Sequence, residues 1–308
     1  MNKGYIYALV AASLWGCLDV LAKILLQEGV SPLVMATIRS TVAFIGGFAA
    51  LWVSKKVILH IPIRTMLLLV FNGLIGIACF YFLLFYTIHI SNVITAVFLL
   101  YSAPIFVTIF GRVIFGESLD RGKLIGLVFS IGGIGLLLGV YDPGNLKISI
   151  PAIASGLGSG ASFACMSLLT KSATSKLDSM TVAAWSYGFG SIFLLFFSHQ
   201  ALGAQTYSLW IWGVLVMMGL FMTLGALYFY AKSLKHIEAG RASITSTTEV
   251  LVASCLSILW LDERIDPLQA TGGILMLSGI ILVQIKKAKQ TDPSTLSAFR
   301  KVWERPGG

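Results

Sequence analysis

The chain has 308 residues, of which 57% are hydrophobic and only 11% are charged, and its net charge is +9. Soluble domains carry charge on about a quarter of their residues, so this composition excludes an ordinary soluble protein. It predicts an all-α integral membrane protein whose surroundings are the lipid bilayer.

Ten apolar stretches follow one another along the chain, each near the roughly 20 residues that a helix needs to cross a bilayer. Proline-containing breaks separate several of them, as at Ser31-Pro32, Ile61-Pro62 and Ile150-Pro151. We therefore predict ten transmembrane helices, at residues 4–26, 31–53, 66–88, 93–115, 122–140, 150–171, 179–199, 209–231, 239–261 and 268–285.

The second half of the chain repeats the first. A shift of 146 residues lays Glu117 on Glu263 and Gly126 on Gly272. Nearer the start, a shift of 148 aligns Lys23 with Lys171, and a shift of 147 aligns Tyr81 with Tyr228. Such self-similarity outranks local motifs in deciding a fold.

Each half holds five predicted spans, and because five is odd the two halves enter the membrane in opposite directions. The fold class is thus ten helices in two inverted five-helix repeats. We divide the chain into a first repeat, a second repeat and a cytoplasmic tail, at residues 1–142, 143–290 and 291–308.

Basic residues orient the spans. With the amino terminus inside, 18 Lys and Arg residues lie on the cytoplasmic side and only Lys23, Lys147 and Arg264 lie outside. The positive-inside rule therefore predicts that both termini are cytoplasmic. The same rule accounts for the net positive charge, so we expect no nucleic-acid partner.

Three charged residues, Asp19, Arg39 and Glu249, lie well inside predicted spans, away from the span ends, where a charge is costly and is normally paired or faces a polar interior. Asp19 and Arg39 lie at similar depths below the outer face, so we predict that they pair. Two roles stay open for the pair: a structural bridge between two helices, or a site that anchors or gates a zwitterion.

Glu249 lies near the middle of the ninth span and follows five hydroxyl side chains, at residues 243 and 245–248. Such hydroxyls bond back to the helix backbone or line a wet cavity, and we favour the cavity. Pro104 in the fourth span lacks a backbone donor and predicts a helix kink.

Aromatic side chains crowd the same spans. Those that we rank as contacts for a bound small molecule are Trp15, Tyr81, Tyr101, Phe163 and Tyr228, because each offers a large apolar face and the tyrosines add a hydroxyl group. All four cysteines lie in apolar spans without a CxxC motif, so we expect neither a metal site nor a cofactor.

The order and spacing of several short motifs resemble the EamA-type branch of the drug/metabolite transporter superfamily. The motifs are Trp15-Gly16 with Lys23, Arg39, Ala103-Pro104, Phe115-Gly116-Glu117 and Leu261-Asp262-Glu263. This resemblance implies a multi-pass carrier of the bacterial inner membrane rather than an enzyme. It also implies that spans 1 to 4 and 6 to 9 enclose a central cavity, and that the cargo is a small metabolite, commonly an amino acid moving outward.

From this we expect an alternating-access secondary transporter that exports small metabolites, with aromatic or other neutral amino acids as the best choice. The alternative is a multi-helix membrane enzyme or lipid-handling protein that uses Glu249 as an acid or base. The glycine-rich faces of spans 5 and 10 serve either internal packing or a dimer contact, so a monomer and a homodimer both stay open.

Overall fold

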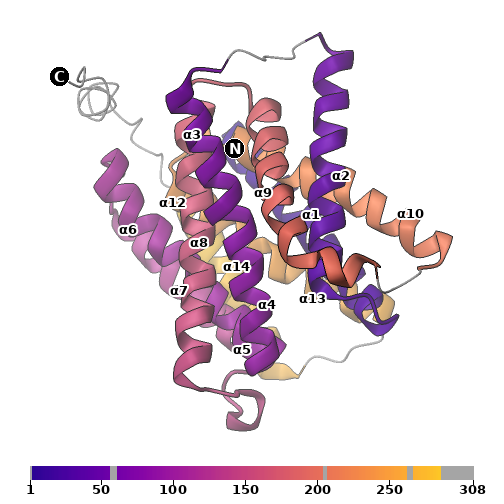
Figure 1. Cartoon of the computed structure of the whole chain (residues 1–308). Helices are drawn as coiled ribbons and strands as arrows, with labels where there is room; N and C mark the ends of the chain where they lie inside the picture. Colours follow the sequence, from indigo (N-terminus) through magenta and orange to yellow (C-terminus); the bar gives the residue numbers. More distant parts are fainter. Residues whose placement is uncertain (1, 56–60, 204–206, 262–265, 286–308) are drawn as a thin grey trace.

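The computed structural model describes residues 2–55, 61–203, 207–261 and 266–285, and within these residues the chain forms helices and turns without a strand (Figure 1). In this part of the chain, nine helical stretches are long and apolar enough to cross a membrane. The helix α7 (Arg121–Leu137) is shorter, at 17 residues, and lies against α14 (Pro267–Ile285), completing the predicted ten. The all-α membrane fold with two repeats is confirmed.

The remaining helices follow the chain in the order that the apolar stretches predict. In the first half they are α1 (Lys3–Gln27), α2 (Pro32–Val53), α3 (Ile63–Phe71), α4 (Phe80–Ile90), α5 (Val93–Leu100) and α6 (Ala103–Phe115). In the second half they are α8 (Ile150–Thr174), α9 (Ser179–Gly203), α10 (Leu209–Met217), α11 (Ala226–Leu234), α12 (Ala239–Ser246) and α13 (Thr248–Leu261). A short 3-10 turn at Pro143–Asn145 lies between the halves.

Corresponding helices of the two repeats pack against each other, α2 on α9 and α7 on α14. Glycines allow the second contact. A Cβ atom on Gly133 would lie 2.6 Å from the carbonyl oxygen of Gly272, and one on Gly126 would lie 2.8 Å from that of Gly279. These glycine faces therefore serve packing within one chain, where small residues let two backbones approach closely.

Spans 3 and 8 each contain a π-helical segment, η1 (Asn72–Cys79) and η3 (Met218–Gly225). The two segments differ by 146 residues, the same shift that relates the acidic motifs. A π-helical turn rotates the following side chains relative to a regular α-helix. The register of α4 and α11 therefore depends on these segments.

Spans 4 and 9 are both interrupted, again at positions 146 residues apart. In span 4 the interruption separates α5 from α6 at residues 101–102, directly before Pro104. Span 9 has no proline, yet α12 ends at Ser246 and α13 begins at Thr248. There the hydroxyls of Ser246 and Thr247 bond back to carbonyl groups three residues earlier, which competes with the regular helix.

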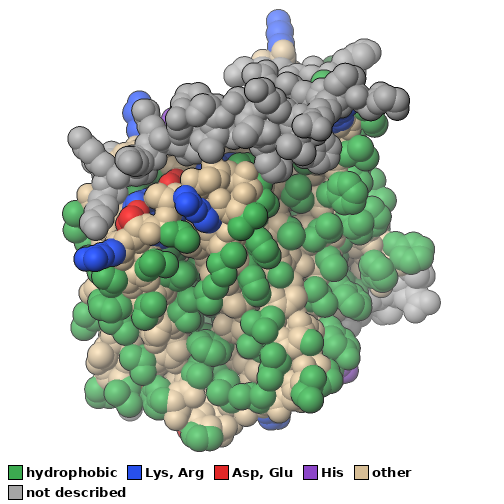
Figure 2. Space-filling model, turned by 90° about the vertical axis from the view of Figure 1, so that its left-hand side faces the viewer, with side chains coloured by type: hydrophobic (Ala, Val, Ile, Leu, Met, Phe, Trp, Pro, Cys, Tyr) green, Lys and Arg blue, Asp and Glu red, His purple; other side chains and the backbone are tan. Residues whose placement is uncertain are grey.

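The two ends of the helix bundle differ in charge. Figure 2 shows hydrophobic side chains over the side of the molecule, with basic and acidic side chains gathered near its upper end. We call this upper end, at which α1 begins, the basic end, and the opposite end, at which α1 ends and α2 begins, the mouth end. The predicted motif at Glu263 and the tail at 291–308 lie outside the described residues.

Candidate functional site

A cavity of about 610 Å³ lies among α1, α2, α4, α5, α8 and α13. Its size falls in the range of small-molecule sites, about 300–1,000 Å³. On α1 its lining runs from Trp15 to Leu26, and on α13 it runs from Glu249 to Ser257. The lining of these helices thus reaches from the middle of the membrane to the mouth end.

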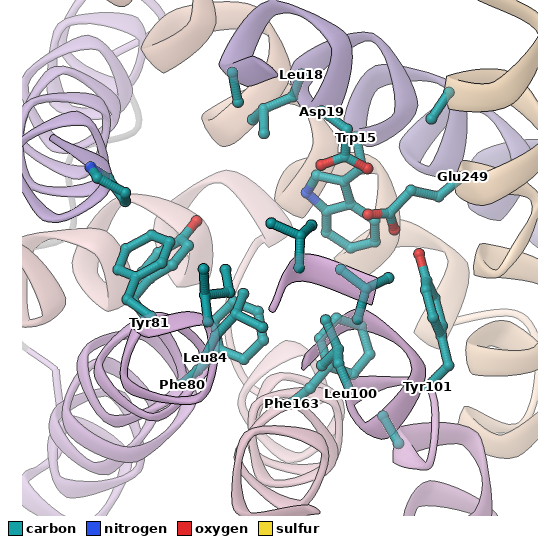
Figure 3. Close-up of a pocket in the computed structure, with 18 of the residues that line it drawn as sticks. Trp15, Leu18, Asp19, Phe80, Tyr81, Leu84, Leu100, Tyr101, Phe163 and Glu249 are labelled. Atoms are coloured by element: carbon teal, nitrogen blue, oxygen red, sulfur yellow. The ribbon is translucent and has the colours of Figure 1, made fainter. Parts of the chain in front are cut away.

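Aromatic rings form the inner wall of the cavity. The rings of Trp15 and Phe163 meet edge to face with their centroids 6.0 Å apart, and Tyr230 lies behind both. Figure 3 shows Trp15 and Phe163 with Phe80 and Tyr81 around the same space. This wall offers broad apolar contact to a bound molecule.

Arg39 lines the cavity from α2 and is almost fully buried, with 4% of its surface exposed. Its Nη2 atom lies 3.4 Å from the hydroxyl oxygen of Tyr81, and its guanidinium carbon lies 5.6 Å from the centre of the Tyr81 ring. Its Nε and Nη1 atoms have no hydrogen-bond partner among the described residues. A buried guanidinium with unused donors is suited to an anionic ligand.

Asp19 and Glu249 also face the cavity, from α1 and α13. Their carboxyl groups point toward one another (Figure 3) and lie close enough to interact directly. Two carboxyl groups this close titrate as a coupled pair, so a proton taken up or released there belongs to both. The hydroxyl group of Tyr101 lies on the same side of the cavity (Figure 3).

The predicted ion pair between Asp19 and Arg39 was wrong. Both residues line the cavity, but the ion pairs of the described residues do not include one between Asp19 and Arg39. The carboxyl group of Asp19 faces that of Glu249 instead, from the other repeat (Figure 3). Depth follows from sequence position, whereas the direction in which each side chain points depends on the rotation of its helix.

Most of the predicted site residues line this one cavity. They are Trp15, Asp19, Arg39, Tyr81, Tyr101, Phe163 and Glu249, together with Pro104. Ser243, Ser246 and Thr247, from the hydroxyl-rich run, line it too. The structure thus joins residues that the sequence could only place separately, from α1, α2, α4, α6, α8, α12 and α13 and from the interruptions of spans 4 and 9.

Tyr228 is the exception, since it does not line the cavity. The sequence match used a shift of 147, but the π-helical segments align at 146, which makes Leu227 the counterpart of Tyr81. Tyr228 then corresponds to Phe82, whose side chain is exposed on the outside. The Tyr228 ring instead faces Lys232, whose Nζ atom lies 4.6 Å from the ring centre.

Tyr187 on α9 is a cavity residue that the sequence analysis missed. It is 4% exposed, and it gave no signal because one tyrosine in an apolar span is unremarkable in sequence. The described residues contain no group of three or more His, Cys, Asp and Glu placed to hold a metal ion. What the cavity offers is two cationic groups, Arg39 and, nearer the mouth end, Lys23, with one acidic pair and a large apolar wall.

Known proteins resemble this chain along most of its length. The uncharacterized transporter YwfM of Bacillus subtilis is 27% identical over 302 residues, which cover 94% of this chain and 97% of that protein. The uncharacterized inner membrane transporter YicL of Salmonella typhimurium is 25% identical, with coverage of 94% and 97%. A crystal structure shares the fold, with a TM-score of 0.79 at 17% identity over 92% of this chain and 99% of that one.

The EamA-like transporter family matches the chain twice, at residues 2–139 and 150–285. The two matches coincide with the two halves that pack together through α2, α9, α7 and α14. This multi-pass membrane protein therefore belongs to the EamA-like transporter family.

Proposed function

We propose that this transporter is an alternating-access carrier that exports small zwitterionic metabolites across the bacterial inner membrane, with aromatic or other neutral amino acids as substrates. The supporting observation is the position of Arg39, whose Nε and Nη1 donors have no partner among the described residues although the side chain is buried. A substrate carboxylate offers two acceptors in the planar arrangement that a guanidinium binds best.

The acidic pair provides the complementary charge. Asp19 and Glu249 share the cavity with Arg39, so a substrate ammonium group can approach the carboxyl pair while its carboxylate approaches the guanidinium group. The apolar part of the substrate then contacts the aromatic wall at Trp15 and Phe163. This division of the cavity favours a neutral amino acid with an apolar side chain.

The direction of the open cavity follows from the charge distribution. Because 18 basic residues lie on one predicted side and three on the other, we assign the basic end to the cytoplasm. The cavity then faces outward, and the structure corresponds to one of the two states between which an alternating-access carrier moves.

Counterflow in proteoliposomes tests the proposal. Three labelled probes of similar size separate the two charges: phenylalanine, its amide, which lacks the carboxylate, and 3-phenylpropionate, which lacks the amine. We expect saturable counterflow of phenylalanine and little of the other two. Equal counterflow of all three would contradict recognition of a zwitterion, and absence of counterflow for every neutral amino acid would reject the proposed substrate class.

Matched variants link the result to the cavity. Arg39→Lys keeps the charge but removes the planar pair of donors, so we expect a loss of phenylalanine counterflow. Tyr81→Phe removes the hydroxyl group beside Arg39, and Tyr228→Phe removes one outside the cavity. Only the first of these two should weaken transport.

A further inference from the structure

A cluster of buried charges lies at the basic end, at the opposite end of the bundle from the cavity mouth. Its members, which we call the charge cluster, are Glu117, Asp120, Lys123, Lys171, Glu238 and Arg241. The side chains of Glu117 and Lys123 are fully buried, and Arg241 is 1% exposed. In the sequence, Glu117 stands out through the repeat, but nothing there connects it with the other five residues.

Three ion pairs of the cluster cross from one repeat to the other. Lys171 Nζ lies 2.6 Å from Glu117 Oε1, and Lys123 Nζ lies 2.8 Å from Glu238 Oε2. The third pair joins Arg241 to Asp120. Because at least one partner of each pair is buried, water and salt screen the attraction between the two repeats less than they would screen exposed pairs.

Backbone contacts tighten the same junction. Glu117 accepts hydrogen bonds from the backbone N–H groups of Ala239 and Gly240, at the start of α12. A Cβ atom on Gly240 would lie 2.9 Å from the Oγ1 atom of Thr108 on α6. The two interrupted spans therefore meet closely here, and the cavity can open at the basic end only if these contacts separate.

The counterparts at the mouth end are largely neutral. By the shift of 146, Lys123 corresponds to Gln269, Glu238 to Asn92 and Arg241 to Thr95. Asn92 and Thr95 bond instead to the backbone of the loop that joins the two halves, at Asn145 and Lys147. Of the three ion pairs that cross between repeats, only Glu117 with Lys171 has charged counterparts at both positions. These are Glu263, at the shift of 146, and Lys23, at the shift of 148 that relates the first and sixth spans.

We propose that this charge asymmetry sets the resting conformation of the transporter, closed at the basic end and open at the mouth end. The closed basic end forms three ion pairs, whereas a closed mouth end would replace two of them with contacts that involve a neutral side chain. Hydrogen bonds between charged groups are stronger than those between neutral ones, so the state that is closed at the basic end is favoured. This inference rests on the proposed alternating access and does not depend on the identity of the substrate.

Thiol labelling in a background without the four native cysteines tests the inference. Thr108→Cys reports opening of the basic end, because Thr108 is 2% exposed beneath α12. Ala253→Cys reports opening of the mouth end, because Ala253 lines the cavity. Labelling rates with a water-soluble maleimide are measured in detergent without substrate, with thermal melting as a check on the fold.

The neutral variant Lys123→Gln with Glu238→Asn gives the basic end the residues that the mouth end already has. We expect Thr108→Cys to react about fivefold faster in this variant and Ala253→Cys to react more slowly, since the two states exchange population. The matched control, Lys176→Gln with Asp178→Asn, removes the same charges from exposed positions of the second repeat and should leave both rates unchanged. If the neutral variant folds and its two thiols are labelled at the parental rates, the inference is overturned.

The reverse variant, Asn92→Glu with Gln269→Lys, installs an ion pair at the mouth end. We expect slower labelling of Ala253→Cys, and unchanged labelling in the folded protein would also overturn the inference. This variant decides the matter alone if the neutral variant does not fold. The labelling rates are measured without substrate. A failed counterflow assay would therefore reject the proposed substrate class but would leave the labelling results unchanged.

Discussion

The carboxylate of Glu117 lies 2.6 Å from the ammonium group of Lys171, and this contact joins the loop after span 4 to span 6 in the other repeat. Lys171 also lies over the ring of Phe115, with its Nζ atom 5.3 Å from the ring centre. A single carboxylate thus pairs with a lysine and caps the start of α12 through two backbone donors. Lys123 of the first repeat lies 3.7 Å from the same carboxylate, so Glu117 has partners in both repeats.

Glu117→Gln should strongly destabilise the protein. The change leaves Lys171 without its opposite charge in a largely buried position, and breaking such a pair costs about 3–5 kcal/mol. Thermal melting in detergent measures the loss. The double variant Glu117→Gln with Lys171→Met removes both charges and should regain most of the stability; a double variant as unstable as the single one would show that the capping of α12 dominates.

Gly133→Ala should weaken the contact between α7 and α14. The added methyl group would lie 2.6 Å from a carbonyl oxygen of Gly272, and overpacking of this kind costs about 1–3 kcal/mol. Gly132→Ala is the matched control, because its methyl group would meet only a leucine side chain at 3.8 Å. We expect lower melting temperatures for Gly133→Ala alone, and equal values for the two variants would contradict the packing described.

Glu249→Gln should insert and fold normally but transport poorly. The amide keeps the size of the side chain and its hydrogen bonding, but it can carry neither a negative charge nor an exchangeable proton, so the acidic pair is reduced to Asp19 alone. We expect counterflow to fall at least about tenfold, equivalent to about 1.4 kcal/mol. Parental counterflow in Glu249→Gln and in Asp19→Asn would assign the acidic pair a structural role.

The basic end should lose stability in acid. Burial alone would raise the pKa of Glu238, but its hydrogen bond and ionic contact with Lys123 and the donors of Ser118 lower the pKa below the usual 4.5. A lowered pKa in the folded state contributes stability above pH 4.5, and this contribution is lost as the pH falls through the folded value. Melting temperatures measured from about pH 6 to 3 should fall less steeply for Glu238→Gln than for the parent.

The effect of acid on the basic end can also be measured by thiol labelling. Protonation of Glu238 weakens its pairing with Lys123, so the thiol introduced by Thr108→Cys should become more accessible at low pH. The rates are first corrected for the pH dependence of the reaction between maleimide and a free thiol. The same pH change applied to Glu238→Gln should have a smaller effect. Identical pH profiles would show that another group controls the acid response.

The amino-acid sequence by itself determined the class of this protein, its spans and its repeats. A bilayer of constant thickness requires apolar stretches of nearly constant length, so the spans can be read from composition alone. The repeat follows from self-similarity, as in Glu117 and Glu263, and needs no structure. The depths of Asp19, Arg39 and Glu249 also follow from sequence position, because a helix rises by a fixed distance per residue.

Only the tertiary structure decided which of these residues meet. A helix in lipid can be apolar on every side, so its sequence does not fix its rotation, and the predicted pairing of Asp19 with Arg39 was wrong for that reason. The π-helical segments add a further rotation, which brings Tyr81 to the cavity but leaves Tyr228 outside it. The charge cluster likewise exists only where the inverted repeats meet, because its ion pairs join residues up to 121 positions apart that no local pattern connects.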